Sequence, residues 1–212
     1  MIKESDIQAE HWNRRARVFG LNLKTLAYGS MKTQYRKFDI LTSTFPKERI
    51  TLLDVGCGFG DLDQYLKQHG YDVDYYGVDI SSEIVSLANH AYPERRIICA
   101  DILHQTVFKG IIFDYVVSTG VNCFNHKKNL EFERNLICKM FNLCKLEAVI
   151  GLQSEAAKWH SAQNQDQDSW YSNPGDYLNY VLKNLSPWAN LMHDYMLHDF
   201  TLFVRKVPHL GS

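Results

Sequence analysis

The 212-residue sequence lacks several features that would place it in a class at once. It has no run of about 18 apolar residues, which a membrane-spanning helix needs, and its first residues contain no apolar signal-peptide core. Its five cysteines are odd in number and form no Cys-x-x-Cys pair, which argues against a disulfide framework and against a zinc site. We therefore expect reduced thiols, a cytoplasmic protein, no membrane partner and no bound metal.

The chain also lacks internal repeats, low-complexity tracts and a strong charge of either sign. Its 23 basic and 24 acidic residues give a net charge of −1, so the broad positive surface that phosphate binding demands is missing and nucleic acid is not an expected partner. Hydrophobic residues make up 45% of the chain and aromatic residues 13%, which is enough to bury one full core. The length suits a single α/β unit with an appendage.

The most informative stretch is Thr-Leu-Leu-Asp-Val-Gly-Cys-Gly-Phe-Gly at residues 51–60. It predicts a buried strand that carries one acid, Asp54, followed by a glycine turn and a helix over residues 61–68. Gly56 and Gly58 remove the side chains that would keep a ligand from the backbone. A dinucleotide-binding fold begins in the same way, so the order of elements alone leaves the ligand open.

Three details favour a cationic ligand. The spacing is G-x-G-x-G rather than G-x-G-x-x-G, no Lys-Ser/Thr pair follows as in a P-loop, and Asp54 puts negative charge where a pyrophosphate would lie. S-adenosylmethionine (SAM) has an adenosine, a sulfonium, an ammonium and no phosphate, and Leu-Asp-Val-Gly-Cys-Gly-Phe-Gly resembles the glycine loop of class I SAM-dependent methyltransferases. The resemblance implies that Asp54, Gly56 and Gly58 contact SAM.

Two further acids follow the next two expected strands. Asp79 lies 19 residues past Gly60, at the tip of the second strand, where a carboxylate can accept both hydroxyl hydrogens of a ribose. Asp101 follows the third strand, and the resemblance implies that it binds the adenine amino group beside the apolar Ile102. Any one of these acids could be an ordinary strand-end residue, whereas three at successive strand ends indicate a binding site.

The remaining pattern completes a Rossmann-like, doubly wound sheet. Strands are expected at residues 50–55, 73–78, 95–100, 113–118, 147–152, 189–196 and 199–205, and helices at 5–19, 30–42, 61–68, 81–91, 129–144 and 174–186. Only Leu197 and His198 separate the last two strands, which permits only an antiparallel pair. The resemblance implies a seven-stranded sheet of order 3-2-1-4-5-7-6 in a SAM-binding domain at 50–212, with Ile80 and Thr119 as further cofactor contacts.

Residues 1–49 form the appendage. They hold ten Lys and Arg residues against five acids, a basic face that is either simply solvated or a cover for an anionic group. In the family an N-terminal helical segment often closes over the cofactor, so we expect a lid in which Tyr28 and Arg36 contact SAM. The aromatic faces of Trp12, Tyr28 and Tyr35 could hold a sulfonium by cation–π attraction.

Candidate acceptor contacts are less specific. Asn122 lies in Ser-Thr-Gly-Val-Asn after the fourth strand, which departs from the Asn/Asp-Pro-Pro-aromatic signature of enzymes that methylate adenine N6 or glutamine N5. Asn122 could bind a substrate or simply form a turn. The polar, aromatic-bearing stretch 154–173 reads as a loop that could bind a substrate or pack over the hairpin.

A histidine is the candidate general base. An amine or hydroxyl acceptor must lose a proton, and His193, with Asp194 or Tyr195 nearby, could take it, although a structural histidine is the favoured alternative. Tyr28 is the third catalytic candidate, beside His193 and Asn122. The repeated His-Asp pairs at 193–194 and 198–199 do not indicate a metal, because no third ligand has suitable spacing.

These observations predict SAM-dependent methyl transfer to a small-molecule acceptor. A same-fold alternative is cyclisation of SAM to azetidine-2-carboxylate with release of methylthioadenosine, which would need no second substrate. An RNA methyltransferase is favoured only by the basic N-terminal segment. A fourth alternative is a non-catalytic SAM sensor, which would not turn over SAM whatever acceptor is offered.

Overall fold

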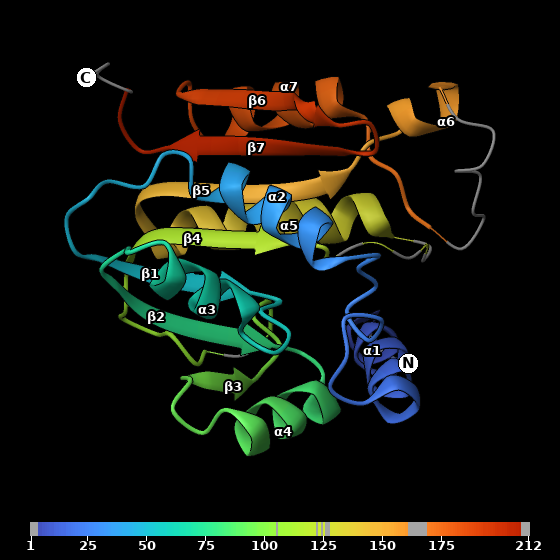
Figure 1. Cartoon of the computed structure of the whole chain (residues 1–212). Coiled ribbons are helices and arrows are strands. Elements are labelled where there is room, and N and C mark those ends of the chain that lie inside the picture. The colour runs from blue at the N-terminus through green and yellow to red at the C-terminus, as the bar shows by residue number, and fades with distance from the viewer. Residues whose placement is uncertain are drawn as a thin grey trace.

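The computed structural model describes residues 4–104, 106–121, 123, 125, 128–160 and 169–208. These residues form a seven-stranded sheet of order β3-β2-β1-β4-β5-β7-β6 (Figure 1). The strands are β1 (Ile50–Val55), β2 (Val73–Asp79), β3 (Ile97–Cys99), β4 (Phe113–Thr119), β5 (Cys144–Gln153), β6 (Ala189–Met196) and β7 (Asp199–Arg205). Strands β1 to β5 pair in parallel with one another, and β7 is antiparallel to both β5 and β6, which confirms the predicted topology.

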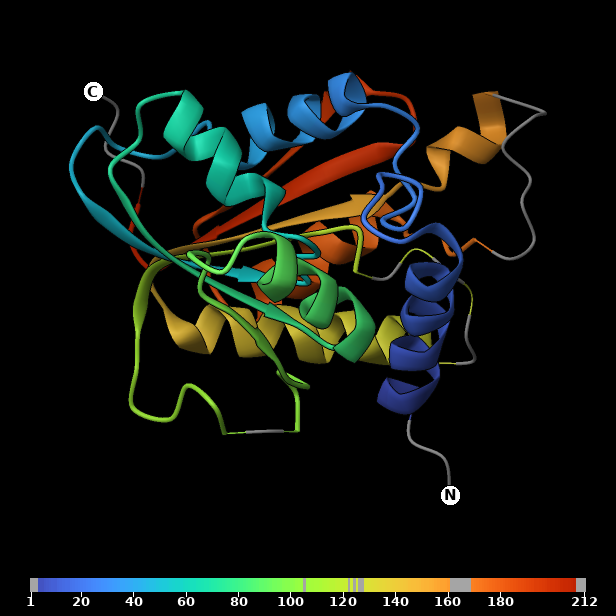
Figure 2. The ribbon, with the colours of Figure 1, turned by 60° about the horizontal axis from the view of Figure 1, so that its bottom comes forward.

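Helices cover both faces of the sheet. They are α1 (Glu4–Phe19), α2 (Met31–Leu41), α3 (Asp61–Gln68), α4 (Ser82–Ala91), α5 (Asn129–Leu143), α6 (Ala156–His160) and α7 (Pro174–Asn184). Helices α2 and α3 lie on one face and α5 on the other, which the turned view in Figure 2 shows clearly. The core is accordingly split in two, with α5 and α7 packed on one side of the sheet and α1 to α4 on the other.

Local sequence explains where several helices begin. Ser30 caps α2 and forms a capping box with Thr33, while the Ser81 hydroxyl accepts a hydrogen bond from the Ile84 N–H at the start of α4. Helix α1 begins at Glu4, one residue before its predicted start, and stops before Gly20, which has a φ of +59°. The predicted helix and strand boundaries are otherwise mostly within one or two residues of the observed ones.

Three elements differ more from the prediction. Strand β3 is only Ile97–Cys99; Arg95, the first residue of the predicted strand, lies before it and donates to the Phe59 carbonyl at 2.6 Å. Strand β5 begins at Cys144, directly after α5, and so is longer than predicted. The stretch predicted as a loop at 154–173 begins with the short helix α6, and residues 161–168 lie outside the described part of the chain.

The N-terminal segment lies at the carboxyl ends of the parallel strands (Figure 1). Helix α1 packs against α4, where the Asn13 side-chain oxygen accepts hydrogen bonds from the Ser81 hydroxyl at 2.7 Å and the Glu83 N–H at 3.2 Å. Trp12 of α1 and Phe38 of α2 belong to the same hydrophobic cluster as the neighbouring strands and helices. In the described residues, no helix is both long and apolar enough to cross a membrane.

Candidate active site

The glycine turn between β1 and α3 is held tightly. The N–H groups of Gly56 and Cys57 both donate to the Val78 carbonyl, at 2.8 and 3.2 Å, which ties the turn to the end of β2. Gly56 has a φ of +73°, and a Cβ there would lie 2.2 Å from Cγ2 of Val121. A Cβ on Gly58, whose φ is +57°, would lie 2.9 Å from both Cδ atoms of Leu26. The glycines therefore allow other parts of the chain, as well as a ligand, to approach the turn.

Asp79 is buried at the tip of β2 and orders the turn. Its Oδ2 accepts the Gly58 N–H at 2.9 Å, and its Oδ1 accepts the Ser81 N–H at 2.9 Å. Burial raises the pKa of this carboxyl, and the backbone hydrogen bonds oppose that rise. Because each carboxylate oxygen can accept more than one hydrogen bond, Asp79 keeps capacity for a ligand's hydroxyl groups.

Asp54 lies buried on β1 beside the turn. The Tyr75 hydroxyl donates to its Oδ2 at 2.8 Å. Burial raises the pKa of the Asp54 carboxyl to about 7, with the nearby Asp79, Asp61 and Asp63 adding to the rise and the Tyr75 hydrogen bond opposing it. A cation bound next to Asp54 would favour its ionised form, so the site suits a positively charged ligand.

Asp101 and three less polar residues complete the strand-end set. Asp101 accepts the Leu103 N–H at 3.0 Å, and its second oxygen lies 2.7 Å from Nδ1 of His104. Ile102 is buried, whereas Ile80 and Thr119 are half-buried, and all three line the same cavity as the acids.

That cavity lies between the strand ends and the N-terminal segment, and residues of both line it. Asp54, Asp61, Asp79 and Asp101 contribute four carboxyl groups to its wall, and none of the described lining residues is a lysine or arginine. Gly56 and Gly58 also line it. An acidic, glycine-floored cavity suits a cationic nucleoside such as SAM, and all of the predicted cofactor residues except Arg36 line it.

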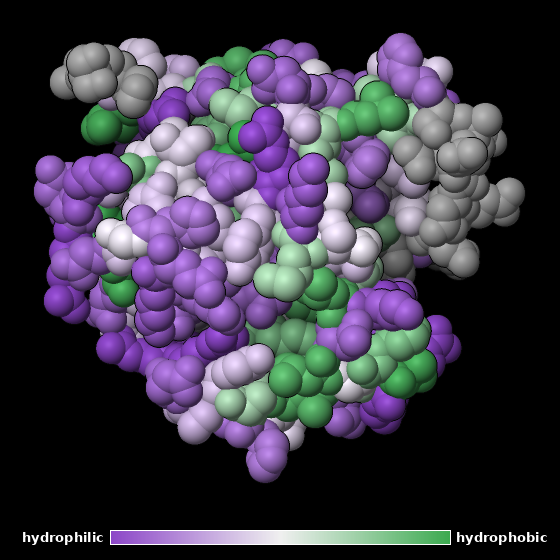
Figure 3. Space-filling model, viewed as in Figure 1, coloured by the Kyte–Doolittle hydropathy of each residue, from purple (hydrophilic) through white to green (hydrophobic). Residues whose placement is uncertain are grey.

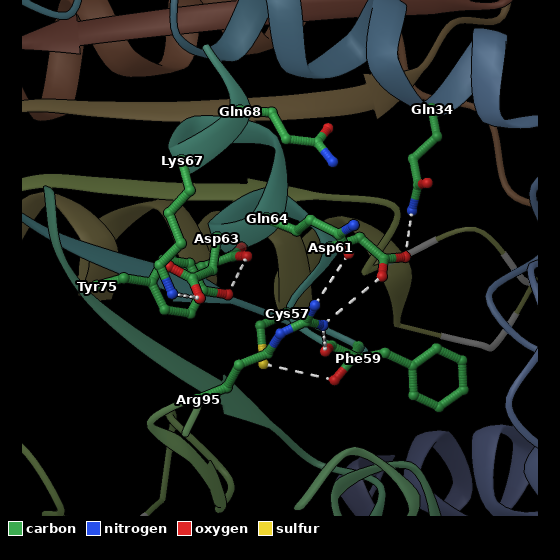
Figure 4. A network of polar contacts seen from close by, with 12 residues as sticks. Gln34, Cys57, Phe59, Asp61, Asp63, Gln64, Lys67, Gln68, Tyr75 and Arg95 are labelled. Carbon is green, nitrogen blue, oxygen red and sulfur yellow. Dashed lines mark hydrogen bonds and ion pairs between the residues drawn. The ribbon is translucent and has the colours of Figure 1, made fainter. Parts of the chain in front are cut away.

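The N-terminal segment closes one side of this cavity. The residues that it contributes to the lining are Gln8, Trp12, Leu26, Tyr28, Gln34 and Phe38. In Figure 4, Gln34 points from α2 toward Asp61 at the start of α3, and its amide nitrogen donates to Oδ2 of that acid at 2.8 Å. Arg95 holds the other side of Asp61, with an Nη1 to Oδ1 distance of 4.0 Å. This network fastens α2 to the edge of the cavity.

Tyr28 lies in the connection between α1 and α2 and lines the cavity. Burial, together with the charges of Asp54 and Asp199, raises the pKa of its hydroxyl, and the nearby Thr119 side chain opposes that rise. A Cβ added to Gly120 would lie 4.0 Å from the Tyr28 hydroxyl. The phenol is thus neutral and can act as a hydrogen-bond donor or as an aromatic wall.

The basic character predicted for residues 1–49 does not face the cavity. Arg15 donates to the Thr25 carbonyl at 3.0 Å, and Arg17 pairs with Glu10 and Glu83. Arg36 is exposed on α2 and is absent from the described lining, so its expected contact with the cofactor is not supported; Gln34 and Lys37, on other sides of the helix, face the two cavities instead.

The outer surface of the N-terminal segment is partly apolar. Figure 3 shows hydrophobic residues gathered toward the lower right, the side on which Figure 1 places α1 and the segment after it. The exposed large apolar residues among the described residues of this segment are Ile7, Val18, Phe19, Leu21 and Met31. The predicted aromatic contact Tyr35 instead packs edge-on against Tyr65 and donates to Gln68.

The predicted general base, His193, does not lie at the large cavity. His193 lies on the edge strand β6, where its Nε2 is 2.7 Å from the Ser154 hydroxyl, and it lines an open surface depression with Trp159 and Asp194. His193 is not among the described residues that line the large cavity, so the structural interpretation of this histidine is the better one. Asn122, the other acceptor candidate, lies outside the described residues.

A second, smaller cavity adjoins the first and was not predicted. The two cavities share Leu26, Tyr28 and Gly120 as walls. Lys37 of α2 and Asp199 of β7 line the second cavity and form an ion pair of 2.9 Å between Nζ and Oδ1. In the sequence, Asp199 stands out only as half of a His-Asp pair. Its place as the first residue of the antiparallel strand is the signal that could have placed it at this edge of the sheet.

Known proteins resemble this chain in both sequence and fold. A family model described as "Methyltransferase domain" matches residues 53–137. The curated Mycobacterium tuberculosis protein named "Putative methyltransferase Rv1506c" is 29% identical over 167 residues, which span 72% of this chain and 91% of that protein.

Solved structures extend the likeness across the fold. Magnesium protoporphyrin IX methyltransferase from Synechocystis PCC 6803, with bound SAM, superposes with a TM-score of 0.68 at 16% identity and covers 98% of this chain and 99% of its own. The plantazolicin methyltransferase BpumL, in complex with a pentazolic desmethylPZN analog and S-adenosylhomocysteine (SAH), gives a TM-score of 0.63 at 13% identity, over 96% and 99% of the two chains. At these identities, the structures bear on the fold.

The structure and the comparisons lead to the same family. The glycine loop and the strand order with its antiparallel β7 agree with the family-model match and with the curated relative. Together these findings support a class I SAM-dependent methyltransferase, a class whose cofactor is S-adenosylmethionine.

Proposed function

We propose that the enzyme methylates a small molecule held between the N-terminal segment and the carboxyl edge of the sheet. The observation that carries this proposal is the pair of adjoining cavities, which share Leu26, Tyr28 and Gly120 and lie under residues of the chain's own N-terminal segment. Two structural neighbours are named for magnesium protoporphyrin IX and plantazolicin, in line with this substrate class.

In this proposal the two parts of the chain have different tasks. Residues 1–49 act as a lid and residues 50–212 bind SAM, with the ribose on Asp79, the adenine between Asp101 and Ile102, and the cationic end near Asp54. The sulfonium of SAM supplies an activated methyl group. The protein therefore has to orient the acceptor and exclude water, which supplies much of the rate enhancement through effective concentration.

The test uses SAM labelled in its methyl group. The pure protein is incubated with labelled SAM and an extract of the source cells that has been separated into small solutes, RNA and protein. We expect label in the small-solute fraction, with SAH as co-product, and loss of this label with the Asp79→Asn variant. Label in RNA or protein would contradict a small-molecule acceptor, and methylthioadenosine formed from SAM alone would indicate cyclisation instead.

A further inference from the structure

The start of β7 places an acidic residue beside the cofactor cavity. Because β7 runs antiparallel to β5, its first residue, Asp199, pairs with the last residue of β5, Gln153. Asp199 therefore lies at the edge of the sheet where the parallel strands end, the edge at which α/β folds bind their ligands.

The Asp199 carboxylate is only half satisfied. Its Oδ1 is 2.9 Å from Nζ of Lys37, and the two side chains are 5% and 16% exposed, respectively. Its Oδ2 is buried and has no hydrogen-bond partner within the described part of the chain. A buried carboxylate oxygen without a donor is costly, so a hydrogen-bond donor that enters the adjoining cavity would be favoured at this oxygen.

The walls around Asp199 restrict what that ligand can be. Leu26 and Leu152 line the cavity, and the Tyr28 ring, 5.5 Å from Lys37 Nζ, separates it from the cofactor cavity. The Lys37–Asp199 pair has no net charge. A cationic ligand would face Lys37 and an anionic one would face Oδ2 of Asp199, whereas a neutral hydrogen-bond donor meets neither repulsion.

We propose that the second cavity is the acceptor subsite and that the acceptor is an apolar compound whose neutral hydroxyl group donates a hydrogen bond to Oδ2 of Asp199. This inference rests on the proposed function and names the substrate class. In the reaction, a lone pair of the hydroxyl oxygen forms the bond to the methyl carbon, and the carbon–sulfur bond breaks with its electrons left on sulfur. The hydroxyl proton passes to Oδ2 of Asp199, which lies beside the reacting oxygen.

Three probes of nearly equal shape separate the charge classes. Benzyl alcohol is a neutral donor, benzylamine is a cation near neutral pH and benzoate is an anion. Each is titrated into the protein saturated with SAH, and its dissociation constant is measured from the broadening of its NMR signals. We expect the native protein to bind benzyl alcohol several-fold more tightly than either ion.

Two substitutions then shift the preference in opposite directions. Lys37→Met leaves Asp199 without its counter-ion, so benzylamine should become the tightest probe, with a gain of about tenfold over the native protein. Asp199→Asn leaves Lys37 without its counter-ion, so benzoate should gain by a similar factor. Asp194→Asn is the matched control, because Asp194 is an exposed acid of the same hairpin, and it should leave the native order unchanged.

Different outcomes would contradict the proposed function and the proposed acceptor subsite. If the native protein does not bind SAH, the proposed function is wrong as well. If SAH binds but the native protein prefers an ion, or if neither substitution changes the order of the probes, the acceptor subsite alone is wrong. A variant that loses SAH binding is set aside as damaged, and the native order together with the other variant still decides.

Discussion

The two halves of the carboxyl edge are built in different ways. The half formed by β1, β2 and β3 takes Asp54, Asp79 and Asp101 from three successive strand ends, within a stretch of about fifty residues. The half formed by β5 and β7 depends on Lys37 and Asp199, which are 162 residues apart in the chain. The half proposed to bind the cofactor (the cofactor half) is therefore encoded by short local motifs, whereas the half proposed to hold the acceptor depends on tertiary contacts that no local pattern reveals.

The largest effect is expected in the glycine turn of the cofactor half. Gly56→Ala would place a Cβ 2.2 Å from Val121, so we expect it to lower the free energy of unfolding by about 2 kcal/mol or more and to abolish SAM binding. Gly70→Ala is the matched control, since Gly70 has the same φ of +73° with no atom within 4 Å of the added Cβ. Urea unfolding of both variants separates overpacking from backbone strain, and equal losses would rule out the steric explanation.

The next effect concerns Asp79. Asp79→Asn keeps the size of the side chain but turns one acceptor oxygen into a donor, so we expect SAM affinity to fall roughly tenfold or more, about 1.4 kcal/mol per decade. Asp74→Asn, on the same strand but paired with Arg96 at the surface, should change SAM affinity little. Calorimetry on the folded variants measures both. An unchanged affinity in Asp79→Asn would remove the ribose role.

The pH dependence of SAM binding tests Asp54. Because its pKa is raised to about 7 in the free protein, Asp54 stabilises the fold at low pH, and this contribution is lost as the pH rises through about 7. SAM favours the ionised carboxylate, so its affinity should rise with pH and level off above about 7, by up to about tenfold per unit below that value. Calorimetry from pH 5.5 to 8.5 should show this slope in the native protein but not in Asp54→Asn; parallel curves would contradict the cation contact.

The smallest effect is expected in the lid, which joins the two halves. We expect hydrogen exchange at residues 10–40 to slow when SAM binds, because the segment covers the cavity. Tyr28→Ala should lower the turnover rate more strongly than the free energy of unfolding. It removes an aromatic ring whose cation–π attraction to the sulfonium would be worth about 0.5–2 kcal/mol. Unchanged exchange with normal turnover would leave the segment a purely structural role.

The sequence predicted the fold well because its signals are local. Hydrophobic runs and the caps Ser30 and Ser81 set the elements, and the two-residue link between the last strands forced the antiparallel pair. The predicted contact between Arg36 and the cofactor is not supported, because the face of α2 that meets the cavity depends on how the helix packs. His193 was predicted as the general base from its side-chain chemistry alone. It lies on the edge strand β6, away from the cofactor cavity, and this separation follows from the sheet order rather than from the local sequence.

The most direct test of the central claim is calorimetric titration of the pure native protein with SAM and, in parallel, with NAD. The acidic, glycine-floored cavity predicts micromolar binding of SAM and of SAH, with a raised melting temperature for each. It predicts no comparable effect of NAD, whose pyrophosphate would face Asp54 and Asp79. Binding of NAD without binding of SAM would contradict the account.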